Sequence, residues 1–264
     1  MGVSLRLTSD ERAALARDGL LVRRGVFGAA ECRQIAADCE ALVAELEALH
    51  RRPKHKVGAY MFEMQRELNT VVKWEPFAPD LLQGVELFAH LSPALKAWAS
   101  VDRLIDPARD LVGQADVIPF TEKLNLKRAR EGGAYVLHQD AAYWSQVTPV
   151  YANIATAMVL MDGASVENGC LQVAPGSHRS GLYERKLIEG FGAFEMDESA
   201  FDLTRMAPVE GGAGDVIFFG SFLVHRSLPN RSDHDRRALL FSYQPAGQPH
   251  SRELQRPAVI KALA

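Results

Sequence analysis

The chain has 264 residues, of which 47% are hydrophobic and 24% are charged. Its net charge is −3 and its pI is about 6.3. This composition is typical of a soluble globular protein that needs no disulfide or structural metal to form a core. Because the charge is slightly negative, no global positive field would attract nucleic acid, and none is expected as a partner.

The cysteines and the apolar segments indicate the expected cellular compartment and whether the chain contacts a membrane. Cys32, Cys39 and Cys170 have neither the spacing of a zinc site nor that of a disulfide framework, which favours a reducing cytoplasm. No apolar stretch follows Met1, and the longest apolar-rich segment, Tyr151 to Met161, is too short to span a bilayer. We therefore expect a cytoplasmic monomer or homodimer with no membrane contact.

The first part of the chain reads mainly as helix. A capping pattern at Thr8-Ser9-Asp10 predicts a helix that stops near Asp18-Gly19, and an extended segment follows to Phe27. Apolar residues at helical spacing predict a long helix from Ala29 to His50 and a second helical region from Pro79 to Leu104. These segments predict a helical layer over about residues 8–105.

After Asp106 the pattern changes to short strands separated by turns rich in Gly, Pro, Asn and Asp. The expected strands are Ala115–Ile118, Glu122–Lys127, Tyr135–Leu137, Ile154–Leu160, Cys170–Val173, Val216–Phe219 and Ala238–Tyr243. Many short strands with turn signals favour an antiparallel sandwich or barrel, and helices that do not alternate with strands argue against a parallel sheet. The prediction is one domain over residues 1–264, mainly β with flanking helices, whose β core spans about residues 108–245.

The segment His138-Gln139-Asp140 contains the first candidate metal ligands. On a strand, the side chains at i and i+2 point to the same face, so His138 and Asp140 can both point inward. An imidazole and a carboxylate supply two positions of the 2-His-1-carboxylate triad of non-haem iron(II). Alone the pattern is common, and a polar pair at a strand end is the competing interpretation.

His225 supplies the third candidate ligand, and Arg236 lies eleven residues after it. A turn at Pro229–Ser232 predicts two adjacent antiparallel strands that would place this histidine and arginine side by side. Many iron(II) oxygenases with this triad bind 2-oxoglutarate as a cosubstrate. A guanidinium group can hold its C5 carboxylate through two parallel hydrogen bonds. Ser227, two residues after the histidine, would add a hydroxyl on the same face.

Several motifs in order resemble the phytanoyl-CoA dioxygenase family of double-stranded β-helix oxygenases, over about residues 108–245. The motifs are Glu122–Lys127, His138–Trp144, Glu167–His178, Gly214–Phe219 and the set His225, Ser227, Asn230, Ser232 and Arg236. The resemblance implies a jelly roll, or cupin-like fold, with iron ligands His138, Asp140 and His225 and with Arg236 as the cosubstrate anchor. It also implies that a polar residue before the first histidine contacts the cosubstrate: Asn125 is the best match, and Lys123 on the same strand face is a second candidate.

The resemblance implies an iron(II)- and 2-oxoglutarate-dependent dioxygenase that uses O2 and releases succinate and CO2. A carboxylate at Asp140 favours hydroxylation, because related halogenases have a small residue there; desaturation, epoxidation and ring formation are the alternatives, because they share the same oxidising species. Three aromatic residues near the histidine, Tyr135, Tyr143 and Trp144, are candidate substrate contacts, with core packing as the alternative.

The substrate is expected to be a small organic molecule. Lys127, Arg128 and Arg130 would lie near the cavity entrance and attract an acidic group, unless they are only solvated, and the long segment Arg179–Arg205 would act as a lid. The alternatives are a cupin-like metalloenzyme that does not use 2-oxoglutarate and a non-catalytic binding protein of the same fold.

Overall fold

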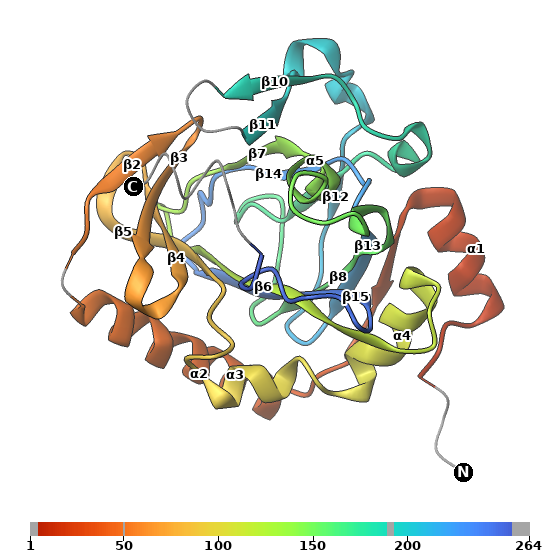
Figure 1. Ribbon diagram of the computed structural model, residues 1–264, viewed down its shortest axis with the longest axis horizontal. Coiled ribbons are helices and arrows are strands. Elements are labelled where there is room, and N and C mark those ends of the chain that lie inside the picture. Colours follow the sequence, from red (N-terminus) through yellow and green to blue (C-terminus); the bar gives the residue numbers. More distant parts are fainter. Residues whose placement is uncertain (1–4, 50, 189–192, 255–264) are drawn as a thin grey trace.

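Two antiparallel β-sheets lie at the centre of the protein (Figure 1). The computed structural model describes residues 5–49, 51–188 and 193–254, and within them the large sheet has nine strands. In spatial order these strands are β1 (Leu20–Arg23), β13 (Val216–Gly220), β8 (Ala155–Leu160), β15 (Arg236–Pro245), β6 (Val117–Lys127), β5 (Ala78–Glu86), β4 (Thr70–Glu75), β3 (Tyr60–Gln65) and β2 (Lys54–Val57).

The small sheet faces part of the large one. Among the described residues it has four strands, in the order β12 (Ala207–Val209), β9 (Leu171–Val173), β14 (His225–Ser227) and β7 (Tyr135–His138). A separate hairpin joins β10 (Arg185–Ile188) to β11 (Ala193–Met196). The helices are α1 (Ser9–Asp18), α2 (Ala29–Ala48), α3 (Pro93–Trp98), α4 (Asp102–Val112) and α5 (Asp140–Trp144). Short 3-10 turns are Arg66–Leu68, Tyr151–Asn153, Ser177–Ser180, Glu198–Ala200 and Leu203–Arg205.

Strand β8 shows why the sheets pack as they do. All six of its residues are buried, so it reads as a continuous apolar run. Ala157 and Val159 belong to the core that the helices cover, whereas Met158 and Leu160 belong to the core between the two sheets. Because strand side chains alternate, one strand serves both cores, and the arrangement is the jelly roll expected from the sequence.

Helices α2, α3 and α4 lie together along one face of the large sheet (Figure 1). Helix α1 begins with the predicted capping box, in which Thr8 and Glu11 exchange hydrogen bonds, and ends at Gly19. Helix α2 buries Ile35, Leu42 and other apolar side chains in the core against the sheet. No helix among the described residues is long and apolar enough to cross a membrane.

The predicted helical region from Pro79 to Leu104 is wrong over residues 79–86, which belong to strand β5. Residues 82–85 of β5 are buried on both faces between β4 and β6, so the strand shows no alternation, and its leucines resemble a helical stripe. The helical layer also does not run unbroken over residues 8–105, because β1 to β5 from this part of the chain belong to the large sheet.

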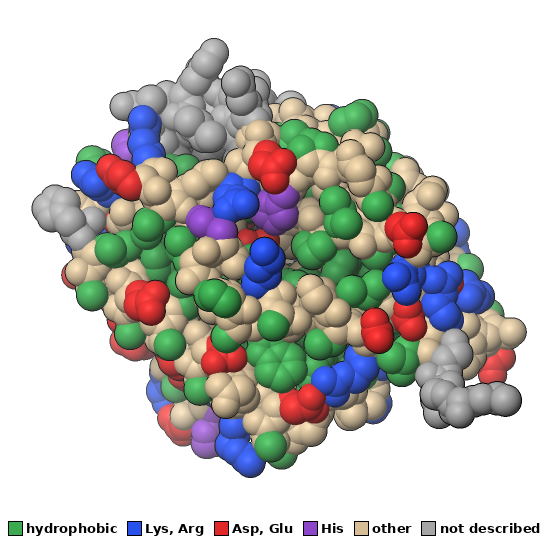
Figure 2. Space-filling model, turned by 60° about the horizontal axis from the view of Figure 1, so that its bottom comes forward, with side chains coloured by type: hydrophobic (Ala, Val, Ile, Leu, Met, Phe, Trp, Pro, Cys, Tyr) green, Lys and Arg blue, Asp and Glu red, His purple; other side chains and the backbone are tan. Residues whose placement is uncertain are grey.

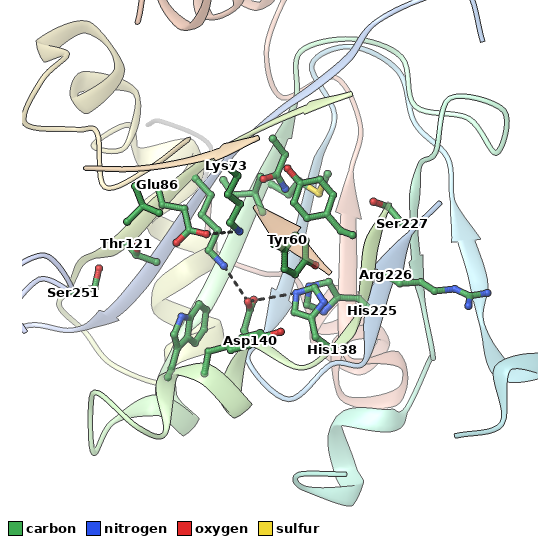
Figure 3. A pocket seen from close by; sticks show the side chains of 18 of the residues that line it. Tyr60, Lys73, Glu86, Thr121, His138, Asp140, His225, Arg226, Ser227 and Ser251 are labelled. Carbon is green, nitrogen blue, oxygen red and sulfur yellow. Dashed lines mark hydrogen bonds and ion pairs between the residues drawn. The ribbon is translucent and has the colours of Figure 1, made fainter. Parts of the chain in front are cut away.

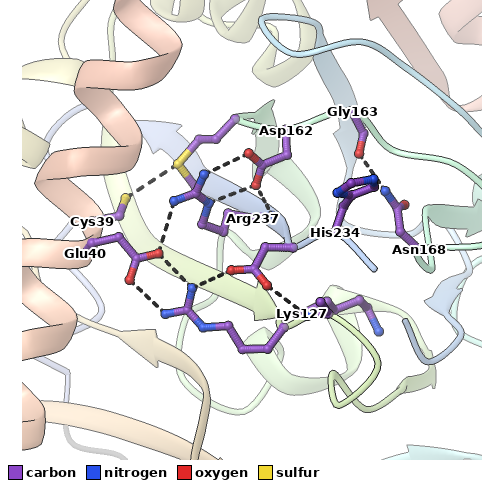
Figure 4. Close-up of polar contacts among 12 residues, drawn as sticks. Cys39, Glu40, Lys127, Asp162, Gly163, Asn168, His234 and Arg237 are labelled. Atoms are coloured by element: carbon purple, nitrogen blue, oxygen red, sulfur yellow. Dashed lines mark hydrogen bonds and ion pairs between the residues drawn. The ribbon is translucent and has the colours of Figure 1, made fainter. Parts of the chain in front are cut away.

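The basic segment after β6 was expected near the cavity entrance, but it is tied into the scaffold. Arg128 forms ion pairs of 2.8 and 2.9 Å with Glu40 of α2 and with Asp235 (Figure 4). Arg237 joins the same cluster through Asp162 and Glu40. These contacts connect α2 to β6 and β15, so this arginine stabilises the packing of the helix rather than lining the cavity.

Candidate active site

His138, Asp140 and His225 meet at the end of the small sheet. Each offers one ligand atom, and the three atoms lie within 4.8 Å of one another. His138 ends β7 and His225 begins β14, and the antiparallel pairing places them opposite each other with ring centroids 4.1 Å apart (Figure 3). The predicted triad therefore comes together from two neighbouring strands and the turn after the first.

Asp140 reaches the site differently from the prediction. It is the first residue of helix α5 and not part of a strand. The intervening Gln139 is extended, and its side-chain amide donates to the carbonyls of Gly181 and Phe222 at 2.8 and 2.6 Å. These bonds fix the bend of the chain, so Asp140 faces the histidines although it has left the sheet.

Both imidazole rings are oriented by the backbone carbonyl two residues earlier in the chain. Nδ1 of His138 lies 2.7 Å from the carbonyl of Val136, and Nδ1 of His225 lies 2.9 Å from that of Leu223. A proton on Nδ1 donates to each carbonyl, which leaves the lone pair of Nε2 for a metal. The donor set of two neutral imidazoles and one carboxylate fits iron(II).

The charge states of the three groups suit a metal. Burial, together with the neighbouring His225, lowers the pKa of His138 to about 3, and burial also lowers the pKa of His225. Burial alone would raise the pKa of Asp140, but the Lys123 ammonium 3.3 Å away and the two histidines lower it. At neutral pH both rings are therefore neutral and the carboxylate is charged, as metal ligands must be.

Arg236 lies in the same cavity, but on the opposite sheet from His225. Its strand, β15, pairs with β6 and β8, whereas β14 pairs with β7 and β9, so the prediction of adjacent antiparallel strands is wrong. The two side chains converge across the space between the sheets, because the sandwich closes and not because a hairpin joins them.

The buried guanidinium of Arg236 can receive a carboxylate. The residue is 1% exposed, Nη2 donates to the carbonyl of Gly169 at 2.6 Å, and Nε has no partner among the described residues. Burial lowers the pKa of Arg236 to about 10, so it is still charged at neutral pH. An unpartnered donor on a buried cation fits the C5 carboxylate of 2-oxoglutarate.

The other predicted cosubstrate residues also line this cavity. Ser227 follows His225 on β14, and Asn125 lies on β6. Lys123 contacts the ligand carboxylate, because its Nζ donates to Asp140 at 3.3 Å. A role of Lys123 in cosubstrate binding stays a prediction.

The three predicted aromatic residues line the cavity too. The ring of Tyr143 lies 5.8 Å from that of His138. Trp144 is 6% exposed and packs edge-on against Phe120 at 5.5 Å, so it is part of both a small core and the cavity wall. The Tyr135 hydroxyl donates to the carbonyl of Gln83 at 2.9 Å and thereby connects β7 to β5.

The cavity has a volume of about 220 Å³, and its far end comes from residues that the sequence reading missed. These residues are Tyr60, Lys73, Glu86, Thr121 and Ser251. A signal for some of them existed, because the β-branched and aromatic residues of Thr70–Glu75 are typical of a strand. Residues 179–186 and 196–205 of the expected lid are not among those that line the cavity.

One buried lysine lies behind the cosubstrate end. Lys127 is opposite Arg236 in the pairing of β6 with β15, and its ammonium donates to the carbonyls of Gly133 and Leu228. Burial and the positive charge of Arg236 lower the pKa of Lys127 to about 6, although Glu75 opposes them. Lys127 is fully buried, so it does not attract substrate at the entrance as the sequence had suggested.

A jelly roll that presents two histidines and a carboxylate beside a buried arginine defines a non-haem metal oxygenase site. The model of the phytanoyl-CoA dioxygenase family, PhyH, matches residues 15–238, and the chain belongs to this family.

Two relatives of this chain carry the names of a dioxygenase and a hydroxylase. The chain is 30% identical over 172 residues to the 2-aminoethylphosphonate dioxygenase of an uncultured bacterium, HF130_AEPn_1, across 65% of this chain and 62% of that protein. It is 32% identical over 151 residues to the methylphosphonate hydroxylase of Gimesia maris, across 57% of this chain and 54% of that protein. The matches thus span less than two thirds of the length of both relatives.

The fold has counterparts among solved structures. EctD from S. alaskensis, crystallised with 2-oxoglutarate and 5-hydroxyectoine, superimposes with a TM-score of 0.71 at 24% sequence identity. The match covers 94% of this chain and 78% of EctD. At this level of identity the likeness establishes the jelly-roll fold.

Proposed function

We propose that this chain is an iron(II)- and 2-oxoglutarate-dependent dioxygenase that hydroxylates a small polar molecule and releases succinate and CO2. The observation that carries the proposal is the buried guanidinium of Arg236, with its unpartnered Nε, in one cavity with His138, Asp140 and His225. A cupin-like site that used no 2-oxoglutarate would have no use for this buried cation. The family membership and the names of the two relatives support the same activity.

The roles of the residues follow from their contacts. His138 and His225 would bind iron(II) through Nε2, since their Nδ1 atoms face the backbone carbonyls of Val136 and Leu223. Asp140 would supply the carboxylate, held in place by Lys123. Arg236 would hold the C5 carboxylate of 2-oxoglutarate, with Ser227 and Asn125 beside it.

When bound, iron(II), 2-oxoglutarate and O2 together supply the oxidising power for a C–H bond. The protein positions the substrate and keeps water away. Phe120, Trp144 and Met158 form an apolar part of the wall, and Tyr143 lies next to His138. A carboxylate at Asp140 occupies the position that a halide would need, which favours hydroxylation.

A small substrate fits the cavity and accords with relatives named for 2-aminoethylphosphonate and methylphosphonate. Several expectations from the sequence stay predictions: no nucleic-acid partner, a cytoplasmic location, and a monomer or homodimer.

The test is anaerobic addition of iron(II) and 2-oxoglutarate to metal-free protein, followed by visible absorption spectroscopy. We expect the weak charge-transfer band of the chelate in the wild type and no band in His225→Ala. In Arg236→Ala the band should require far more 2-oxoglutarate. Matched controls are His234→Ala and Arg231→Ala, because both residues are exposed and neither lines the cavity.

Either result is informative. A band with these dependences supports the proposal, and screening for succinate release stimulated by small polar molecules then follows. Iron bound with no band on addition of 2-oxoglutarate would overturn it in favour of a metalloenzyme without this cosubstrate.

A further inference from the structure

A row of alternating charges connects the far end of the cavity to the metal ligands. Lys73 on β4 pairs with Glu86 on β5 at 2.6 Å, and their side chains are 11% and 13% exposed. Glu86 lies directly opposite Lys123 in the pairing of β5 with β6, and Lys123 reaches Asp140 at 3.3 Å. Figure 3 shows the first and last of these ion pairs in one view. A single carboxylate is thus flanked by two ammonium groups.

Two buried hydroxyls lie at the same end. Thr121 and Ser251 line the cavity, are 2% and 3% exposed, and have hydroxyl oxygens without a hydrogen-bond partner among the described residues. In Figure 3 both lie on the side of Glu86, away from His138 and His225. Buried hydroxyls normally find partners, so two of them beside an ion pair indicate a place where a polar ligand would complete the hydrogen bonding.

The mouth of the cavity agrees with a charged ligand. On the face in Figure 2, basic and histidine side chains gather around a hollow near the centre of the view. Arg226 lines the cavity, but its Nε donates to Gln172, and in Figure 3 its guanidinium extends away from the metal ligands. Among the described lysines and arginines that line the cavity, Lys73 and Lys123 are therefore the cations, besides Arg236, that face its interior.

The charges at this end have both signs. Lys73, Lys123 and Glu86 all line the cavity, so a ligand here meets two ammonium groups and one carboxylate. Buried charges are costly unless they are paired, so a ligand that replaces part of the row should itself carry charges of both signs.

We propose, on the basis of the function proposed above, that the Lys73–Glu86–Lys123 row is the substrate subsite. It would take a small molecule with both an acid group and an amino group. The acid group, carboxylate or phosphonate, lies between Lys73 and Lys123, and the ammonium lies against Glu86. Thr121 and Ser251 complete the hydrogen bonds. Glu86 is the specificity-determining residue, because among the described residues that line the cavity it is the carboxylate other than the metal ligand Asp140, and it can therefore distinguish an amino acid from a simple acid.

The test uses protein loaded with iron(II) and 2-oxoglutarate without oxygen, and measures binding by calorimetry and by the change in the charge-transfer band. Two sets of probes share a skeleton and differ in charge. One set is 2-aminoethylphosphonate, ethylphosphonate and ethylamine; the other is 4-aminobutanoate, butanoate and butylamine. We expect the doubly charged member of at least one set to bind about tenfold or more tightly than both partners. The set that binds distinguishes phosphonate from carboxylate.

Two variants test whether the Lys73–Glu86–Lys123 row causes the preference for the doubly charged probe, and a third serves as the control. Glu86→Gln should weaken binding of the doubly charged probe about tenfold and leave the singly charged acid unchanged. The swap Lys73→Glu with Glu86→Lys restores the ion pair but reverses its direction, so it should keep the melting temperature and still lose the preference. Glu67→Gln, in an exposed ion pair with Arg52, is the matched control and should change nothing.

The outcomes separate the two proposals. Absence of the charge-transfer band in the wild type would count against the proposed function itself. A normal band with no preference for the doubly charged probe in either set would overturn the substrate class alone. So would an unchanged preference in Glu86→Gln or in the swapped pair, because a purely structural ion pair predicts that result.

Discussion

The two ends of the cavity are built in different ways. At the metal end, His138 and His225 are held by the backbone carbonyls two residues before each of them, and Gln139 fixes the turn that delivers Asp140. At the far end, Lys73, Glu86 and Thr121 come from three neighbouring strands of the large sheet.

This difference teaches what each end is suited to do. Donors fixed by backbone hydrogen bonds form a rigid site that is ready for a metal. An ion pair of two long side chains can open and exchange partners, which suits a ligand that replaces part of the pair. Under the two proposals made above, the metal end would serve the reaction and the far end the choice of substrate.

The largest expected effect is a loss of iron(II) affinity when Asp140 is replaced. The Asp140→Asn variant should lower the affinity for iron(II) at least about 100-fold, because an amide is a weaker ligand than a carboxylate. Competition with a coloured chelator measures this affinity. Asp233→Asn, whose side chain is 70% exposed, is the control. Unchanged iron affinity in Asp140→Asn would remove Asp140 from the ligand set.

The next effect concerns Arg236 alone. Arg236→Lys keeps the charge but loses the bidentate geometry, so the affinity for 2-oxoglutarate should fall about 10- to 100-fold while iron affinity is kept. Calorimetric titration of the iron-loaded protein under nitrogen measures both affinities. The control is Arg231→Lys, an exposed arginine outside the cavity. Equal loss of iron and 2-oxoglutarate would show that Arg236 supports the whole site rather than the cosubstrate.

The next expected effect is a pH dependence of stability that comes from Lys127, which lies opposite Arg236 in the pairing of β6 with β15. Its folded-state pKa of about 6 lies below the value of about 10.4 in the unfolded chain. Between these values the unfolded chain binds more protons, so the free energy of unfolding should rise with pH, by up to about 1.4 kcal/mol per unit. This contribution is greatest above the unfolded pKa and is lost as pH falls through the folded pKa.

Urea unfolding between about pH 6.5 and about pH 8.5 measures this slope. Lys127→Met should flatten it relative to the wild type, and the exposed Lys96→Met should not. Parallel slopes in all three proteins would mean that Lys127 is charged in the folded state.

The smallest expected effect concerns Tyr135, which lies between the metal end and the far end of the cavity. Tyr135→Phe removes the hydroxyl that donates to Gln83 and leaves a buried carbonyl without this bond, at a cost of about 1 kcal/mol in the free energy of unfolding. A thermal melt measures the change. Because Tyr135 connects β7 to β5, probe binding at the far end should weaken more than iron binding. The reverse order would argue that the hydroxyl serves the metal end.

One glycine explains how β5 and β7 come so close. A Cβ on Gly84 would lie 2.6 Å from the carbonyl of Leu124 and 3.0 Å from the hydroxyl of Tyr135. Only a residue without a side chain therefore allows β5 to pack here against β6 and the tyrosine. The sequence contains this glycine, but nothing in its local pattern reveals which neighbour approaches it.

The sequence by itself determined the chemistry of the metal end. His138, Asp140 and His225 were identified from short local motifs, and the structure brings these three residues together. Arg236 was identified too, but by a wrong route, since a hairpin was expected where two sheets face each other. A ligand motif depends on residue type and spacing, which the sequence states directly.

Only the tertiary structure decided the far end. Strand β5 was predicted as helix because it is buried on both faces, so its period of two is hidden. Lys73, Glu86 and Thr121 come together through the pairing of β4, β5 and β6, and Ser251 through the chain beyond β15. Such contacts join residues far apart in the sequence, and their formation depends on how the whole sheet packs rather than on any local pattern.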